Sequence, residues 1–265
     1  MNAYLFDVDG VLSDPKEKRV TQEELFDELI YLLMFGDVVC LNTGRSLVWM
    51  EERVIDPVLE KIGDKKHLER FIAIGEKGGA WMTFDSEGKK YHEIDRTISV
   101  PQELQQEVRT LIENQYKDSM FFDATKETML SIEMNDGFDI PKFHEAQQKL
   151  NEDIKKILEQ RKLTDQYKID PTVIATDIEN NHVGKAFGAD RFLSFLESKQ
   201  LSPEFFTAFG DSKSDFEMAD ELQNRGKQVS FVFVGDKAKL GDIQKPYAIE
   251  YVEGFTQGTL VYLTK

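Results

Sequence analysis

Apolar runs and helical stripes of apolar residues alternate along the first 42 residues of the chain. The run at residues 4–8 predicts a short buried strand, and a second run at 38–41 predicts another. Between them, apolar residues recur at helical spacing after residues 21–24, a Thr-Gln-Glu-Glu sequence that predicts a capping box. Gly36 is expected to end this helix. Strand, helix and strand in this order indicate a right-handed βαβ unit of a parallel sheet.

The last third of the chain repeats this alternation. Each of its apolar runs follows a stretch with helical spacing, as expected for further strands of the same doubly wound sheet. The pattern predicts helices over residues 185–197 and 215–222, strands over 205–209, 229–234 and 247–252, and a last helix from about Thr256. The first and last parts of the chain therefore indicate one α/β domain that is divided in the sequence.

The middle of the chain has a different pattern, with short alternating segments and long polar helices. It predicts strands over residues 120–122, 129–134, 167–169 and 173–177, and a charged helix from Pro141 to about Arg161. We therefore expect an α/β fold with a mostly parallel, Rossmann-like core sheet and an inserted α+β domain. The expected core comprises residues 1–83 and 183–265, and the expected insert comprises residues 84–182.

The composition is that of an ordinary soluble globular protein, with 40% hydrophobic and 31% charged residues among 265. The unbroken apolar stretches are too short to cross a bilayer, so no membrane partner is expected. A net charge of −16 repels nucleic acid and argues against that class of partner. The single cysteine, Cys40, lies in an apolar run and is expected to be a buried small residue rather than a nucleophile. We expect a cytoplasmic protein, and the composition leaves its oligomeric state open.

Two aspartates follow the first predicted strand. Asp7 and Asp9 are two residues apart, so they project from the same face at the carboxyl end of the strand, where open α/β sheets bind ligands. Such a pair can hydrolyse a phosphate ester, with Asp7 as nucleophile and Asp9 as general acid and base. Gly10 would allow a sharp turn after them. A strand that simply runs into an Asp-Gly turn explains this segment equally well.

Thr43, Gly44 and Arg45 follow the second predicted strand. The Thr43 hydroxyl and the amides beside the flexible Gly44 could donate hydrogen bonds to a phosphoryl oxygen, and Arg45 could bind phosphate through two parallel hydrogen bonds. A threonine that caps the next helix and a solvated arginine are the alternatives. Lys185 begins a predicted helix, where a buried ammonium would neutralise phosphoryl charge, although most lysines are surface residues.

Asp211 and Asp215 lie where the strand at 205–209 leads into a helix. One helical turn separates them, so both carboxylates could face one point. Magnesium prefers oxygen ligands and keeps several waters, which suits one direct and one water-mediated carboxylate. An aspartate at the helix N-cap with another in the first turn would also explain the pair.

Together, the four segments resemble those of phosphatases of the haloacid dehalogenase superfamily. The similar segments are Asp7-Val8-Asp9-Gly10, Thr43-Gly44-Arg45, Lys185 and residues 210–215. The insert between the second and third segments looks like the Cof-type, class IIB cap, which in that family selects the substrate. The resemblance implies that magnesium is held by Asp7, the backbone carbonyl of Asp9, and Asp211, with Asp215 in support. It also implies that Thr43 and Lys185 hold the phosphoryl group.

The resemblance implies a magnesium-dependent phosphatase for a small phosphorylated metabolite, with a sugar phosphate as the expected substrate. A phosphomannomutase-like phosphotransferase is one alternative, but mutases with this cap type usually carry a Ser-Asp pair where this chain has Thr43-Gly44. A non-catalytic module that binds a phosphometabolite is another. The presence of Asp9 argues against it, because a binding module needs no acid/base carboxylate.

Overall fold

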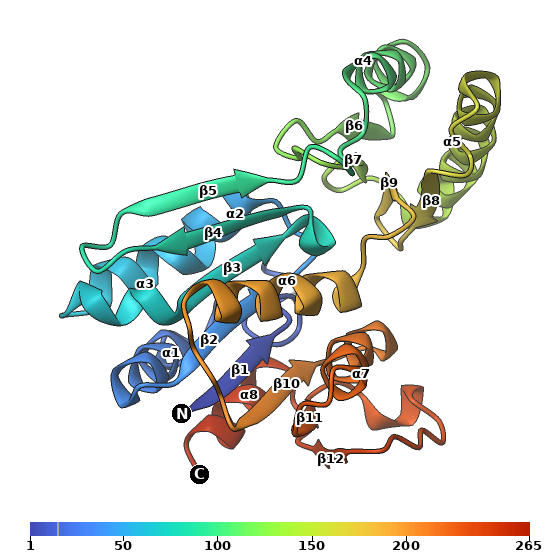
Figure 1. Cartoon of the computed structure of the whole chain (residues 1–265). Helices are drawn as coiled ribbons and strands as arrows, with labels where there is room; N and C mark the ends of the chain where they lie inside the picture. The colour runs from blue at the N-terminus through green and yellow to red at the C-terminus, as the bar shows by residue number, and fades with distance from the viewer. Residues whose placement is uncertain (15) are drawn as a thin grey trace. The chain divides into compact units, whose positions relative to one another are not determined.

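The computed structural model describes residues 1–14 and 16–265, which form two compact units (Figure 1). One unit comprises residues 1–93 and 184–265, and the other comprises residues 94–183. Each unit has its own hydrophobic core. The insert thus begins later than residue 84, the limit expected from the sequence, because residues beyond 84 add a strand to the large sheet.

The large unit is built on an eight-stranded sheet with the order β12-β11-β10-β1-β2-β3-β4-β5. All neighbouring pairs from β12 to β3 are parallel, and β3 pairs with β4 in the antiparallel direction. The predicted α/β fold with a mostly parallel sheet is therefore confirmed. Its strands are β1 (Asn2–Phe6), β2 (Val38–Asn42), β3 (Phe71–Gly75), β4 (Ala80–Phe84), β5 (Lys90–Ile94), β10 (Phe205–Gly210), β11 (Val229–Phe233) and β12 (Ala248–Tyr251).

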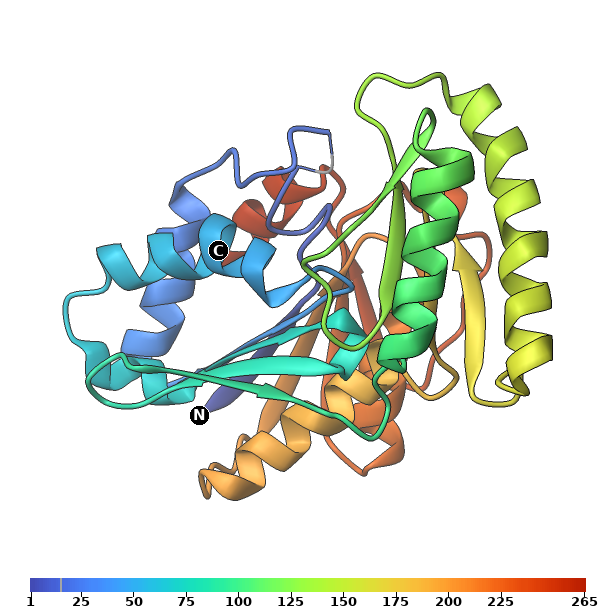
Figure 2. The same ribbon diagram turned by 90° about the horizontal axis from the view of Figure 1, so that it is seen from above.

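Helices cover both faces of this sheet (Figure 2). Alternate strand residues such as Leu5, Cys40 and Ile72 pack with α6 and α7 in one buried cluster. On the other face α1 contacts β2, α3 and α8. The helical segments of the large unit are α1 (Glu24–Phe35), α2 (Leu47–Met50), η1 (Glu51–Ile55), α3 (Asp56–Lys61), η2 (Lys65–Arg70), η3 (Glu76–Gly78), α6 (Lys185–Ser198), η5 (Lys213–Asp215), α7 (Phe216–Asn224), η6 (Lys237–Lys239) and α8 (Thr256–Leu263).

The two ends of α1 gave different outcomes for the sequence predictions. The helix ends as expected at Gly36, whose φ of 99° lies in the left-handed region that glycine adopts at little cost. The predicted capping box is wrong, because the helix starts at Glu24 and its N-cap residue, Glu23, accepts no side-chain hydrogen bond. A preceding turn supplies backbone acceptors instead, since Leu25 and Phe26 donate their amides to the carbonyls of Gln22 and Glu23.

The smaller unit is an α+β structure, as the pattern of the middle segment predicts. Its four-stranded sheet has the order β6-β7-β9-β8 with antiparallel neighbours. Alternate strand residues, among them Leu130, Ile132 and Ile178, form a buried cluster with residues of α4 and α5. The elements are α4 (Gln102–Leu111), η4 (Ile112–Tyr116), β6 (Met120–Phe122), β7 (Leu130–Met134), α5 (Ile140–Arg161), β8 (Tyr167–Pro171) and β9 (Ala175–Asn180).

None of the helices in the described part of the chain is both long enough and apolar enough to cross a membrane.

Candidate active site

Three of the predicted site residues lie together at the carboxyl edge of the large sheet. β1 pairs with β10 on one side and with β2 on the other, so Asp7, Thr43 and Asp211 follow adjacent strands. The Asp7 amide donates a hydrogen bond to the carbonyl of Phe209, 3.0 Å away. The strand order reverses between β1 and β10, and such a switch point is where open α/β sheets bind their ligands.

Lys185 lies between two buried carboxylates. Its Nζ is 2.5 Å from Oδ1 of Asp7 and 3.0 Å from Oδ1 of Asp215. The same ammonium donates a hydrogen bond to the backbone carbonyl of Asn42, 2.9 Å away. Asp215 is completely buried and Asp7 is 8% exposed. The surface lysine that base rates favour is therefore not what the structure shows, since this side chain is enclosed by acceptors.

Burial and charge shift the pKa values of these three groups in different directions. Burial, together with the negative charge of Asp215, raises the pKa of Asp7 well above its usual value, although Lys185 opposes the shift. Burial also disfavours ionisation of Asp215, but the Lys185 ammonium and the hydrogen bonds from Ser212 outweigh it and lower the pKa of Asp215. Burial disfavours the charged form of Lys185, yet the two carboxylates raise its pKa.

Asp215 also organises the loop that carries Asp211. Its Oδ2 accepts hydrogen bonds from the amides of Asp211 and Ser212, at 3.2 and 3.0 Å, and from the Ser212 hydroxyl at 2.8 Å. Ser212 is the N-cap of η5 and Asp215 completes its capping box. The alternative in which Asp211 caps the helix is therefore wrong, because Ser212 takes that place. The first-turn role of Asp215 is present beside its contact with Lys185.

Asp211 is held close to the first aspartate segment. Burial and the charge of Asp215 raise its pKa to about 6. Gly10 has a φ of 77°, and a Cβ atom there would lie 2.3 Å from Oδ2 of Asp211. Only glycine fits this conformation and this close approach.

Three carboxylates could hold a metal ion. Oxygens of Asp7, Asp211 and Asp215 all lie within 4.8 Å of one another. An all-oxygen, partly buried donor set of this kind suits magnesium. The carboxylate of Asp9, which belongs to the predicted magnesium site through its backbone carbonyl, is outside this group.

The Asp9 carboxylate instead forms an ion pair with Arg45. Nε of Arg45 is 2.8 Å from Oδ2 of Asp9, and Nη2 is 3.0 Å from Oδ1. The Arg45 guanidinium also lies over the indole of Trp49, 4.9 Å from the ring centroid. The arginine is thus less solvated than the surface alternative requires, with 19% of its side chain exposed.

Thr43 and Gly44 form the turn between β2 and α2. Thr43 is buried, its amide donates to the carbonyl of Ile74, and its hydroxyl accepts a hydrogen bond from the Arg45 amide at 3.2 Å. The N-cap of α2 is Ser46, so the alternative in which Thr43 caps this helix is wrong. At Gly44 a Cβ atom would lie 3.6 Å from Cε of Lys77.

No role was assigned to Asn42 from the sequence, although this residue directly precedes Thr43. This fully buried residue binds Lys185 twice, because its side-chain amide donates to the backbone carbonyl of Lys185 at 2.9 Å and its own carbonyl accepts from Nζ. Gly188 provides the space for it, since a Cβ atom there would lie 2.1 Å from Oδ1 of Asn42. The sequence did carry a signal for this residue, because Asn42 is the polar last residue of an otherwise apolar strand at the carboxyl edge of the sheet.

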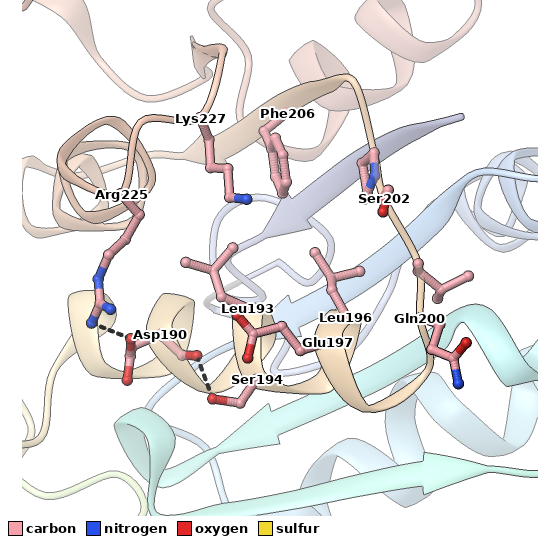
Figure 3. A pocket seen from close by; sticks show the side chains of 12 residues that line it. Asp190, Leu193, Ser194, Leu196, Glu197, Gln200, Ser202, Phe206, Arg225 and Lys227 are labelled. Atoms are coloured by element: carbon pink, nitrogen blue, oxygen red, sulfur yellow. Dashed lines mark hydrogen bonds and ion pairs between the residues drawn. The ribbon is translucent and has the colours of Figure 1, made fainter.

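A separate pocket of about 630 Å³ lies on α6 and the start of β10 (Figure 3). An ion pair between Arg225 and Asp190 closes one end of it, and the Ser194 hydroxyl donates to the backbone carbonyl of Asp190 at 3.2 Å. Phe206, near the amino end of β10, lines the pocket, whereas Asp211 follows the carboxyl end of the same strand. The pocket is therefore distinct from the carboxylate cluster.

No protein-family model and no curated protein sequence matches this chain. Among solved structures, trehalose-6-phosphate phosphatase from Aspergillus fumigatus is similar, with 18% identity and a TM-score of 0.57 over 99% of this chain and 91% of that one. Thermoplasma acidophilum 0175 is similar over 99% and 96% of the two chains, with 16% identity and a TM-score of 0.58. Plasmodium falciparum IMP-nucleotidase, in a mutant form with bound IMP, shows 16% identity and a TM-score of 0.59 over 100% of this chain and 66% of that one. These similarities show a shared fold.

Proposed function

We propose that this protein is a magnesium-dependent phosphatase that acts on a small phosphorylated metabolite, with Asp7 as the nucleophile. One observation supports it above all, the placement of Asp7 beside Lys185 and within 4.8 Å of Asp211 and Asp215 at the switch point of the sheet. A carboxylate, an ammonium and a set of oxygen ligands at one point are the groups needed to transfer a phosphoryl group through a covalent intermediate.

The proposed reaction has two halves. An oxygen of Asp7 attacks phosphorus, the bond from phosphorus to the ester oxygen breaks, and Asp9 donates a proton to the departing oxygen. Asp9 then accepts a proton from the water that attacks the aspartyl-phosphate, which frees phosphate and restores Asp7. Lys185 and the hydroxyl and amides of Thr43 and Gly44 would bind the phosphoryl oxygens.

Magnesium would be held by Asp7, the backbone carbonyl of Asp9, and Asp211, with Asp215 supporting the loop. The bound ion would neutralise negative charge on the phosphoryl oxygens. A phosphate contact from Arg45 stays a prediction, since its guanidinium lies on Asp9.

The proposed substrate is a sugar phosphate. The similar fold of trehalose-6-phosphate phosphatase supports this choice, whereas the similar fold of IMP-nucleotidase makes nucleoside monophosphates the class to test against it. We further propose that the unit at residues 94–183 acts as the substrate-selecting cap that the sequence led us to expect at residues 84–182. The cytoplasmic location stays a prediction.

The test is phosphate release from a panel of sugar phosphates and nucleoside monophosphates, with magnesium or with EDTA. Turnover should require the metal, and Asp7→Asn should lower kcat on the order of a thousandfold or more, because the nucleophile is lost. Asp37→Asn is a matched control. Asp37 is also a buried aspartate of this sheet, but it precedes β2 and accepts its hydrogen bond from the Asn2 amide, so activity should persist.

Two results would contradict the proposal. One is full turnover by Asp7→Asn, which would exclude the covalent route. The other is a folded, magnesium-binding wild-type protein that releases phosphate from no member of the panel, which would favour a binding module.

A further inference from the structure

The contact between Arg45 and Asp9 has the geometry of a guanidinium fork. Two nitrogens of one arginine reach the two oxygens of one carboxylate, at 2.8 and 3.0 Å. Parallel hydrogen bonds of this kind fix both the position and the plane of a carboxylate. The side chains are 19% and 31% exposed, so the pair is partly shielded from water. A lysine could not reproduce this fork, because its ammonium is a point charge.

The Arg45 guanidinium that contacts Asp9 also contacts the indole of Trp49. It lies 4.9 Å from the centroid of the indole, which is within the range of a cation–π contact. Trp49 belongs to α2, whose neighbouring residues Leu47 and Met50 are buried. Its amide donates to the hydroxyl of the N-cap residue Ser46 at 3.3 Å. The backbone that carries the indole is therefore held by the N-cap and by the buried residues of its own helical turn.

A general acid must place its proton donor within hydrogen-bond reach of the departing oxygen. Asp9 has two rotatable side-chain torsions, and the fork restrains both when Asp9 is ionised. In the protonated acid one oxygen would keep its contact with Arg45, while the other carries the proton and faces the departing oxygen. We propose that Arg45 and Trp49 are positioning residues for Asp9, with the indole holding the guanidinium and the guanidinium orienting the carboxylate for proton transfer. This inference rests on the proposed phosphatase activity, and it assigns to Trp49 a role beyond packing.

The experiment uses a series of aryl phosphates that differ in the stability of the leaving phenolate. p-Nitrophenolate leaves without a proton, whereas unsubstituted phenolate depends on the general acid. The value of kcat/KM reports the bond-breaking step, so its dependence on the leaving group measures help from Asp9. Asp9→Asn sets the largest loss that the series can show.

Trp49→Leu and Arg45→Lys should both lower kcat/KM for phenyl phosphate at least about tenfold more than for p-nitrophenyl phosphate. Trp49→Phe should restore most of the phenyl phosphate activity, because it keeps an aromatic face. Arg45→Lys changes no buried ring, so it tests the same proposal if Trp49→Leu folds poorly.

Trp81→Leu is the matched control, since the other tryptophan of the chain stacks on Arg191 at 4.1 Å. If Trp81→Leu unfolds part of the protein, the activity toward both esters should fall by the same factor, because only the concentration of folded enzyme changes.

Equal losses on both esters for Trp49→Leu and Arg45→Lys would overturn the inference. So would weaker inhibition by inorganic phosphate in Arg45→Lys with no change across the series, which would assign Arg45 to phosphate binding instead. A wild-type enzyme that hydrolyses neither ester, and no other phosphate ester, would refute the proposed function itself.

Discussion

Asp211 is a carboxylate that the metal-free fold accommodates at a cost. Its pKa is raised to about 6 by burial and by the charge of Asp215. A raised pKa means that the fold favours the protonated acid. The protonated Asp211 therefore contributes its full stability to the folded state below pH about 4, the pKa of an aspartate in the unfolded chain. That contribution is lost as the pH rises through about 6, the pKa of Asp211 in the folded state. At neutral pH the ionised group therefore destabilises the metal-free protein.

We predict that Asp211→Asn stabilises the metal-free protein at pH 7.5 by on the order of 2 kcal/mol, because the buried charge is removed. The proposed magnesium site would raise the melting temperature of the wild type when the ion binds, and the same change should abolish this rise, since a ligand is lost. Thermal unfolding in EDTA and in magnesium measures both effects. A lower melting temperature in EDTA would contradict this account of Asp211.

At the residue scale, the sequence predicted which polar side chains lie at the site, but it did not predict which groups these side chains contact. Asp7, Thr43 and Asp211 could be selected because each directly follows a strand, and adjacent parallel strands end at one edge. The fork between Asp9 and Arg45 could not be predicted, because strand position gives no side-chain torsion of an arginine in a loop. The contacts of Asn42 could not be predicted for a similar reason, because they depend on how closely α6 approaches β2.

At the scale of elements, the approach of α6 to β2 sets the position of Lys185. Gly188 lets the helix backbone contact the Asn42 amide, which in turn binds the Lys185 carbonyl at 2.9 Å. A bulkier residue at this point has no free space, because both groups are in the buried part of the unit.

We predict that Gly188→Ala destabilises the protein by about 1–3 kcal/mol and weakens inhibition by inorganic phosphate, because its Cβ atom would displace the Asn42 side chain. The double variant with Asn42→Ala should be more stable than the sum of the single effects predicts, since the clash is gone. Chemical denaturation and phosphate inhibition constants measure the two readouts. Strictly additive losses would show that the two residues do not act through one contact.

The element predictions were reliable where apolar periodicity was strong. α6, β10 and β11 lie close to their expected ranges, and Gly36 ends α1. β3, β4 and β5 were not predicted as strands. β5 is an edge strand whose residues are mostly polar, so it lacks an apolar run. β3 has a fully buried apolar run that the sequence prediction did not use. The failed capping box shows that a cap sequence is not sufficient when a preceding turn already supplies acceptors for the first amides.

At the scale of the whole molecule, the two units have separate cores. Phe143 is completely buried in the core of the unit at residues 94–183. We predict that Phe143→Ala costs this unit about 3–5 kcal/mol, through lost burial and a cavity. Hydrogen exchange should accelerate within residues 94–183, while magnesium binding by the other unit persists. Equal acceleration in β1 and β10 would mean that the units unfold as one.

The division of the chain could be predicted from the change in pattern, but the residue at which the insert begins could not. A sequence-based boundary at residue 84 ignores β5, which pairs with the preceding strand β4 at the edge of the large sheet and has too few apolar residues to be predicted as a strand. The net charge of −16 describes the whole chain and does not give the local charge of the site. There, the Lys185 ammonium contacts two of the three clustered aspartates, Asp7 and Asp215.

The position of β1 in the sheet determines when the carboxylates can meet during synthesis on the ribosome. β1 obtains its partner β2 early, but its other edge pairs with β10, and Phe6 lies opposite Phe209. Until residues 205–215 have emerged, the nascent chain carries an unpaired apolar edge and Asp7 lacks Asp211 and Asp215. Such long-range pairing is slow and leaves edges open to association. Chains truncated before this strand should therefore depend on chaperones, and the three aspartates can come together only after residues 205–215 have left the ribosome.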